Sequence, residues 1–358
     1  MRPVYLLGIF IPLAVALELG GASDTLIFFA AALAVVPPAA LMGKATEELA
    51  AKSGPGIGGL LNVTFGNFPE LIIAFFALLE GLQEVVKASI VGSIISNILL
   101  VLGAAMFVGG LGRQRQTFNR TAAHAQSAML LLALVALVMP ALFQLVHSGG
   151  LPSVHAEQRE FSADLEHISL AVALILLVSY LAGLRFSLGT HRDVFNPYAR
   201  EVTESNWSVR RSVTMLAVAG VLVGLMSEIL VGSIANAAED VGLTQFFIGV
   251  IIVAIVGNAA EHWVAVLVAR KDKMDLAVNI AVGSSAQVAL FVTPILVLLS
   301  FVVGDFPLAL VFNGYEIGAM LFAVLIANFL VQEGESNWFE GLQLLAVYAV
   351  LGIVFAFA

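Results

Sequence analysis

The sequence carries one motif twice, each time inside a long apolar run. Gly-Asn-x-x-Glu occupies residues 66–70 and again 257–261, and a Gly-Ser pair follows at 92–93 and at 283–284. Both parts are displaced by the same 191 residues (257 − 66 and 283 − 92). A shared spacing with a shared offset is hard to obtain by chance, so the pattern indicates two copies of one unit. Each copy places a glutamate in apolar surroundings, where an ionised side chain is costly.

The composition excludes a soluble core. Hydrophobic residues make up 60% of the 358 residues and charged residues 11%, and the mean hydropathy is +1.00. A soluble chain would carry roughly a quarter charged residues. Apolar runs long enough to cross a membrane recur throughout, without the period-two alternation of barrel strands. We therefore expect an all-α polytopic membrane protein. The absence of Cys excludes disulfides and thiolate metal sites.

The apolar runs predict eleven transmembrane helices. Their approximate bounds are 3–19, 25–42, 57–79, 88–108, 122–146, 168–184, 213–231, 246–269, 276–299, 308–330 and 339–358. The first run resembles a signal peptide, but a retained helix is favoured. The chain then divides into the N-terminal helix 1–20, a first five-helix repeat 25–184, a linker 185–212 and a second five-helix repeat 213–358.

The distribution of basic residues predicts the orientation. With eleven spans, one side of the membrane holds 14 Lys and Arg residues and the other holds only Lys87 and Arg159. The positive-inside rule then places the N-terminus and the linker in the cytoplasm and the C-terminus on the far side. In a prokaryote the protein would lie in the plasma or inner membrane. Because five is odd, the second repeat enters from the opposite face, so the repeats are inverted, as in secondary transporters.

Glu70 and Glu261 are the candidate ion-binding residues. Ionisable residues within transmembrane spans are rare and usually functional. A structural alternative is neutralisation by a basic residue on another helix. Lys87 and Arg270 lie at the span ends, however, so they do not match the depth of the glutamates. Two facing carboxylates without a basic partner would bind a metal cation or protons.

The neighbours of the two glutamates suit a hard cation such as Ca²⁺, which takes six to eight oxygen ligands. Gly66 and Gly257 would allow local unwinding that directs carbonyls inward. Pro69 has no N–H and would free a carbonyl one turn back, whereas the second copy relies on Gly257 alone. Asn67 and Asn258 each precede the glutamate by three residues. They would either bind the ion or hold the carboxylates, and the second role is favoured.

Other polar residues are supporting candidates. Ser284 is expected mainly to pack between helices. Asn97 and Gln287 are larger amides, and contact with the site is as plausible for them as packing. His262 either relays protons or is a hydrogen-bonded packing residue. Outside the motifs, Glu48 and Glu239 share the 191-residue offset and would attract cations at the two mouths or simply be solvated.

The two motifs with their trailing Gly-Ser segments resemble the cation/proton exchanger family of the calcium:cation antiporter superfamily, over essentially the whole chain. The resemblance implies Ca²⁺ transport driven by protons, with Glu70 and Glu261 as ion ligands and proton acceptors. The sodium/calcium exchanger branch typically has Thr or Ser in these motifs and Asn or Asp after the Gly-Ser, whereas this chain has Ile94 and Ser285 there. The linker also lacks the strongly acidic character of plant and yeast members.

We therefore expect a secondary active antiporter that exchanges Ca²⁺ for H⁺ by alternating access. Its partners would be Ca²⁺ and protons as substrates and the lipid bilayer, with no cofactor and no nucleic acid, and a homo-oligomer is left open. Alternatives are a Na⁺/Ca²⁺ exchanger, a proton exchanger for another divalent cation, or a passive cation channel. An intramembrane enzyme is disfavoured, because such acid proteases use aspartates and the zinc type needs a His-rich helix.

Overall fold

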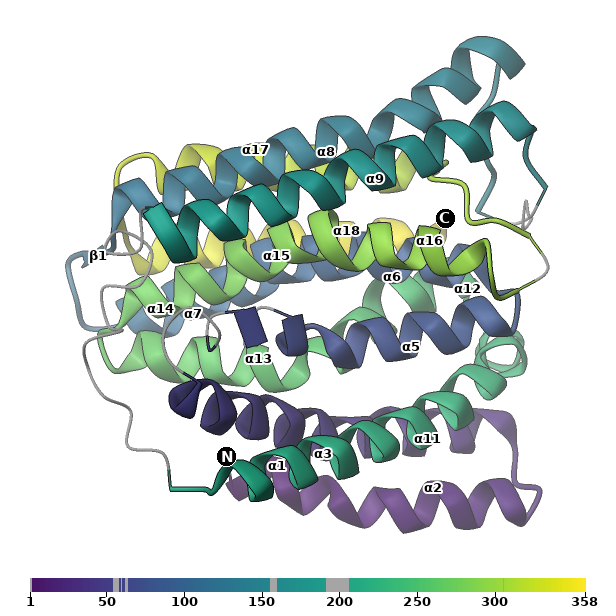
Figure 1. The fold of residues 1–358 in the computed structure, drawn as a ribbon, viewed down its shortest axis with the longest axis horizontal. Helices are drawn as coiled ribbons and strands as arrows, with labels where there is room; N and C mark the ends of the chain where they lie inside the picture. The colour runs from purple at the N-terminus through teal and green to yellow at the C-terminus, as the bar shows by residue number, and fades with distance from the viewer. Residues whose placement is uncertain are drawn as a thin grey trace. The chain divides into compact units, whose positions relative to one another are not determined.

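The computed structural model describes residues 2–53, 58, 60–61, 64–154, 160–190, 206–304 and 306–358. Within these residues the chain is almost entirely helical (Figure 1). The strands described are β1 (Gln116–Thr117) and β2 (Glu335–Ser336), which pair antiparallel. Most of the expected linker, residues 191–205, and part of the loop at 155–159 lie outside the described residues.

Nine helical segments of the described chain are long and apolar enough to cross a membrane. They are Asp24–Lys52, Gln83–Gly110, Arg120–Ser148, Ala163–Thr190, Val209–Val241, Gln245–Arg270, Met274–Ser300, Gly314–Val331 and Trp338–Phe357. The expected spans 3–19 and 57–79 coincide with shorter apolar helices at Val4–Leu19 and Phe68–Leu79. The helical membrane class is therefore confirmed, and the count of eleven spans stays a prediction.

The chain forms two compact units, and each unit takes elements from both halves of the sequence. The first unit comprises Met1–Phe76, Ser179–Gly242 and Val256–Ala260. Its complete helices are α1 (Arg2–Leu6), η1 (Leu7–Ile9), α2 (Phe10–Leu19), α3 (Asp24–Lys52), η3 (Phe186–Thr190) and α11 (Val209–Val241).

Helices α3 and α11 run alongside one another in the first unit (Figure 1). Apolar residues of both helices, Ala39, Met42, Ala219 and Val223, form a buried cluster. At one end of the pair, Asn236 Nδ2 donates to Asp24 Oδ2 at 2.6 Å. Because the start of α3 meets the end of α11, the two helices are antiparallel.

The second unit comprises Ala77–Val178, Leu243–Ile255 and Glu261–Ala358. Its first helices are α6 (Gln83–Ile95), η2 (Ser96–Val101), α7 (Leu102–Gly110) and α8 (Arg120–Ser148). It continues with α12 (Gln245–Phe247), η5 (Ile248–Val253), α14 (Met274–Val278), η6 (Asn279–Gly283), α15 (Ser284–Gln287), η7 (Val288–Val292) and α16 (Thr293–Ser300). It ends with α17 (Gly314–Val331) and α18 (Trp338–Phe357). Helices α5 (Phe68–Leu79), α9 (Ala163–Arg185) and α13 (Ala254–Arg270) contribute to both units.

Glycines allow α6 to pack tightly against the segment 245–253. A Cβ on Gly92 would contact the carbonyl oxygen of Val250 and lie 2.7 Å from Ala254 Cβ. A Cβ on Gly249 would lie 2.8 Å from Ala88 Cβ. Both distances are shorter than van der Waals contact, so any larger residue at either glycine would force these helices apart. Gly92, the first residue of the expected Gly-Ser pair, therefore has a packing role.

The structure corrects the start of the expected span 308–330. Residues 308–312 are non-helical and fully buried, and α17 begins only at Gly314, after the N-cap residue Asn313. Buried side chains bind this non-helical backbone: Ser300 accepts from the Leu308 N–H at 2.7 Å, and Ser169 accepts from the Leu310 N–H at 3.0 Å. Non-helical backbone at membrane depth is tolerated only when protein encloses it in this way. Apolar content alone cannot distinguish such a segment from a helix.

Two features of the second unit follow the 191-residue offset. The helix after each motif contains a π turn, at Ser96–Val101 and at Val288–Val292, and adding 191 to the first range gives 287–292. In addition, Ser285 Oγ lies 3.4 Å from the carbonyl oxygen of Ile94, the residue that the offset pairs with it.

Candidate functional site

Glu70 lies in the first turn of α5 and is buried, with 9% of its surface exposed. A turn at Asn67 separates α5 from the helical residues 64–66, so the helix is interrupted inside the first motif. Phe65 and Phe68 pack across the interruption, with ring centroids 4.6 Å apart. The start of a helix carries a partial positive charge, which stabilises a nearby carboxylate. The local fold therefore places Glu70 near the N-terminal end of α5.

The second motif approaches Glu70 through its glycine. A Cβ on Gly257 would lie 3.3 Å from Glu70 Cγ and 3.6 Å from Ile73 Cδ1. The expected unwinding at Gly257 was wrong, because α13 continues without interruption from Ala254 to Arg270. The glycine instead leaves room for the side chain of Glu70. Parts of both motifs thus lie side by side within the first unit.

The asparagines of both motifs are enclosed. Asn67 is 1% exposed and Asn258 is 0% exposed, and both belong to the first unit. Burial of an amide is costly unless its polar atoms find partners. These amides are therefore fixed in place beside Glu70 and Gly257 rather than solvated.

Glu261 belongs to the second unit, where it is partly buried. The hydroxyl of Ser284 donates to Glu261 Oε2 at 2.7 Å. Ser284, which we expected mainly to pack, therefore contacts the glutamate directly. A serine hydroxyl can rotate, so it can donate to an ionised carboxylate or accept from a protonated one.

The remaining candidates lie on the helices of the second unit. His262 Nε2 is buried and has no hydrogen-bond partner in the described part of the chain. Asn97 is 1% exposed, lies in the π turn after α6, and its Nδ2 likewise has no partner among the described residues. Gln287 is partly buried and ends α15 immediately before the π turn η7. His262 shares α13 with Glu261, whereas Asn97 and Gln287 lie on the helical segments that follow the two motifs.

Among the described residues no three His, Cys, Asp or Glu side chains come together as a metal site. Any cation bound by Glu70 or Glu261 would therefore draw on amide, carbonyl and water oxygens, which Ca²⁺ accepts readily.

The alternative that Glu48 is solvated was wrong, and its proposed place at a mouth stays a prediction. Glu48 is 8% exposed, and its Oε2 accepts from the backbone N–H groups of Asn206 at 2.9 Å and Trp207 at 3.1 Å. Its other oxygen is 3.3 Å from Lys44 Nζ. Glu48 therefore fastens the chain just before α11 to α3. Glu239, its counterpart in the repeat, is exposed.

Sequence reasoning missed a buried charged cluster in the second unit. Lys87 is fully buried, with Nζ 2.6 Å from Glu84 Oε1 and 3.1 Å from the Val311 carbonyl oxygen. Glu316, also fully buried, interacts electrostatically with both charged residues. The signal was present, since Glu316 is an ionisable residue inside an apolar run. Lys87 therefore has a carboxylate partner on its own helix.

Apolar helices and buried acidic motifs define a membrane protein of the ion-transporter class, and comparisons with known proteins agree. The chain belongs to the sodium/calcium exchanger protein family, whose model matches residues 23–189 and 211–357. The expected relationship to cation/proton exchangers is confirmed, because the similar curated proteins include members with that name.

Similar curated proteins match along almost their full length. The Ca²⁺/H⁺ antiporter of Synechocystis sp. is 44% identical over 98% of this chain and 95% of that protein. The Ca²⁺/H⁺ antiporter ChaA of Bacillus subtilis is 43% identical over 96% of both chains. The solved structure of native YfkE is 38% identical, covers 99% of this chain and 100% of that one, and superposes with a TM-score of 0.84. The H⁺/Ca²⁺ exchanger CAX, 15% identical over 99% of this chain and 90% of that chain, has a TM-score of 0.73 and shares the fold.

Proposed function

We propose that this protein is a secondary active antiporter that exchanges Ca²⁺ for H⁺ across the membrane, with Glu70 and Glu261 as the shared binding groups. The observation that carries the proposal is the approach of Gly257 to Glu70, 3.3 Å from a Cβ position to Cγ. It places the glycine of the second motif against the side chain of Glu70. The names of the curated relatives and of the YfkE relative in solved structures point to the same substrates.

The chemistry of the two carboxylates explains exchange. Ca²⁺ is held well only when carboxylates are ionised, and each proton bound removes ligand charge. Protons and Ca²⁺ therefore compete for the same oxygens. The buried amides of Asn67 and Asn258 would orient the carboxylates or complete the oxygen shell around the ion. The Ser284 hydroxyl would donate to the ionised form of Glu261 and accept from its protonated form.

The proposed layout is a lone N-terminal helix followed by two inverted five-helix repeats. The contact of Ser285 with its offset partner Ile94 supports it, as do the π turns at equivalent positions. Rocking of the two repeats past a fixed midplane site would expose that site to each face of the membrane in turn. The carrier needs no cofactor and performs no covalent chemistry.

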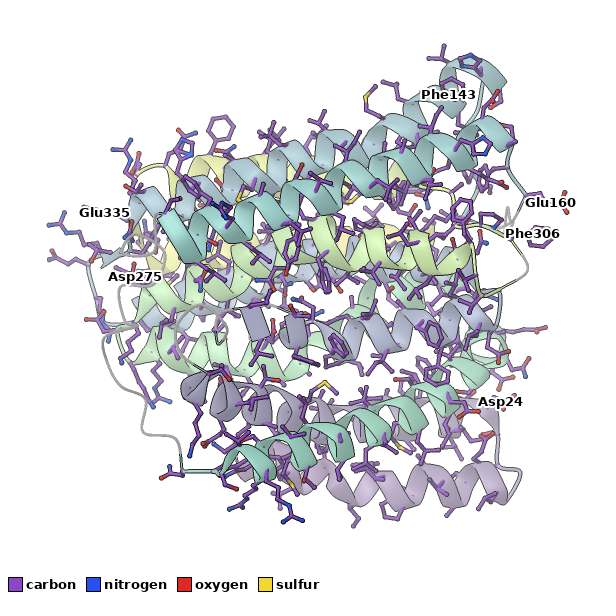
Figure 2. The ribbon with its side chains drawn as sticks, in the orientation of Figure 1. Asp24, Phe143, Glu160, Asp275, Phe306 and Glu335 are labelled. Atoms are coloured by element: carbon purple, nitrogen blue, oxygen red, sulfur yellow. The ribbon has the colours of Figure 1, made fainter. Side chains whose placement is uncertain are left out.

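The proposed orientation places the end of the second unit that carries Asp275 and Glu335 in the cytoplasm. Figure 2 shows these two residues at one end of that unit, and Phe306 and Glu160 at the other. The basic loop Arg270–Lys273 lies beside Asp275 in the sequence, so the positive-inside rule assigns this end to the cytoplasm. The N-terminus is then cytoplasmic and the C-terminus lies on the far side.

Protons rather than Na⁺ are the proposed driving ion. Na⁺ must be partly dehydrated and surrounded by several neutral oxygens beside the divalent site. Gly66, Gly257 and Ile94 offer no side-chain oxygen at the relevant positions. A proton needs only a carboxylate oxygen, which Glu70 and Glu261 supply.

The test of the two-glutamate site is replacement of each carboxylate by its amide. Glu70→Gln and Glu261→Gln keep the side-chain shape and remove the charge, so each should abolish Ca²⁺ uptake into proteoliposomes with an acidic interior. Glu80→Gln is the matched control, because Glu80 is exposed just beyond the end of α5 and should leave uptake unchanged. Thermal unfolding in detergent checks that the variants remain folded. Normal uptake by either folded motif variant would refute the site.

A further inference from the structure

A pair of amides lies next to the Glu261 site in the second unit, and the proposed function gives it no role. Gln126 Nε2 on α8 donates to Asn279 Oδ1 at 2.5 Å. Gln126 is partly exposed and Asn279 is exposed, although both belong to helices of membrane-spanning length. Polar side chains in such spans face water or the protein interior rather than lipid. Gln126 lies on the side of α8 that carries the buried residues Ala123, Ser127 and Leu130, so it contacts Asn279 on the packed side of that helix.

The amide pair adjoins Ser284 through Gly283. A Cβ on Gly283 would lie 3.3 Å from Asn279 Oδ1 and 3.5 Å from Gln126 Nε2. The next residue, Ser284, donates its hydroxyl to Glu261 Oε2 at 2.7 Å. The glycine therefore allows both amides to approach the backbone directly beside Ser284. Five residues separate Asn279 from Ser284, which corresponds to about 7 Å along a helix.

The amide pair lies on the side of Glu261 that leads to the Arg270–Lys273 loop. Asn279 follows Lys273 by six residues, about 9 Å of helix, and Ser284 lies deeper. Asp275, one turn before Asn279, is fixed because its Oδ1 accepts from the Asn119 N–H. A cation that enters from this end would therefore pass the amides before it reaches Glu261.

We propose that Gln126 and Asn279 form an outer binding site for a partly hydrated divalent cation on its way between the cytoplasm and Glu261. Amide oxygens are ordinary Ca²⁺ ligands, and each carbonyl oxygen has two lone pairs. The pair carries no charge, so it holds the ion weakly and releases it to the carboxylate. The inference rests on the proposed Ca²⁺/H⁺ exchange and adds a cytoplasmic step to it.

The expected signature is an effect on one face of the membrane only. Gln126→Leu removes the side-chain oxygen with little change in volume. When Ca²⁺ is supplied at the Arg270–Lys273 face, this variant should raise the apparent KM for Ca²⁺ about fivefold. A change of that size is expected when one polar contact to the ion, comparable to a hydrogen bond, is lost. Gln126→Glu adds a charge at the same place and should lower that KM. Neither variant should change the KM measured from the opposite face. If Gln126 served only for packing, the two substitutions, which are similar in shape, would not change the KM in opposite directions.

The experiment measures ⁴⁵Ca²⁺ uptake driven by a pH gradient in everted and in right-side-out membrane vesicles. Labelling of Lys271→Cys with an impermeant maleimide identifies the face under test, since the chain has no native Cys. Gln144→Leu, near the other end of α8, is the control and should leave both KM values unchanged. If wild type shows no proton-driven uptake, the proposed function fails and this inference falls with it. If the wild type transports Ca²⁺ but the Gln126 variants change the KM measured from both faces equally, or from neither face, the outer site is refuted while the proposed exchange stands.

Discussion

Replacement of Lys87 by methionine should destabilise the protein strongly. The Lys87 side chain is fully buried, and its ammonium donates to Glu84 Oε1 at 2.6 Å and to the Val311 carbonyl oxygen at 3.1 Å. Lys87→Met preserves length and volume but leaves the buried Glu84 carboxylate without its cation. Breaking a buried ion pair on one side costs about 3–5 kcal/mol, because the remaining charge is uncompensated. Glu316, a second fully buried acidic residue, lies within electrostatic reach of Lys87.

The assay is thermal unfolding in detergent, followed by loss of the monodisperse peak in size-exclusion chromatography. At about 2–4 °C per kcal/mol, the values typical of large domains, the midpoint should fall by roughly 6–20 °C. The double variant Lys87→Met/Glu84→Gln should regain part of this loss, because the orphaned charge is gone.

Lys44→Met is the matched control for this prediction. Lys44 pairs with Glu48 at 3.3 Å but is 35% exposed, so water replaces the lost partner. Its removal should cost no more than about 1 kcal/mol. A Lys87→Met variant as stable as wild type, or no more affected than Lys44→Met, would refute the reasoning about the buried cluster.

Three further predictions follow from packing, orientation and competition. Gly92→Ala should destabilise the folded protein by about 1–3 kcal/mol, because the added Cβ would meet the Val250 carbonyl oxygen. Gly224→Ala is the control and should be tolerated in the same thermal-unfolding assay, because its Cβ would lie 3.7 Å from the nearest side-chain atom. Impermeant maleimide should label Lys271→Cys and Val302→Cys from opposite faces of intact cells, and labelling of both from one face would overturn the orientation. The apparent Ca²⁺ affinity should fall as the pH is lowered, because protons remove ligand charge from the carboxylates, and an affinity independent of pH would argue against a shared site.

The sequence was sufficient for the membrane class, the family and most helix positions, because these depend on apolar run length and on repeated spacing. It also placed a helix interruption in the first motif, where Asn67 lies in a turn. Both kinds of information are local, so a single sequence carries them.

Features that depend on distant partners could not be predicted. The buried, non-helical residues 308–312 depend on Ser169, 141 residues earlier in the chain, which accepts from the Leu310 N–H. Glu48 is buried because the chain at 206–207 returns to it. Gly257 serves close approach to Glu70 rather than unwinding, and only the tertiary contact distinguishes these roles. A glycine at this position is compatible with both local unwinding and close packing, so the sequence alone could not decide between the two roles.

The most direct test of the proposed exchange is ⁴⁵Ca²⁺ flux into proteoliposomes that contain the purified protein. An acidic interior without sodium should drive Ca²⁺ accumulation, and collapse of the pH gradient by an ionophore should abolish it. An outward Na⁺ gradient at equal pH should drive little uptake, because the motifs supply few neutral oxygens for Na⁺. Uptake driven as strongly by the sodium gradient as by the proton gradient, or uptake that needs no counter-gradient at all, would contradict Ca²⁺/H⁺ exchange.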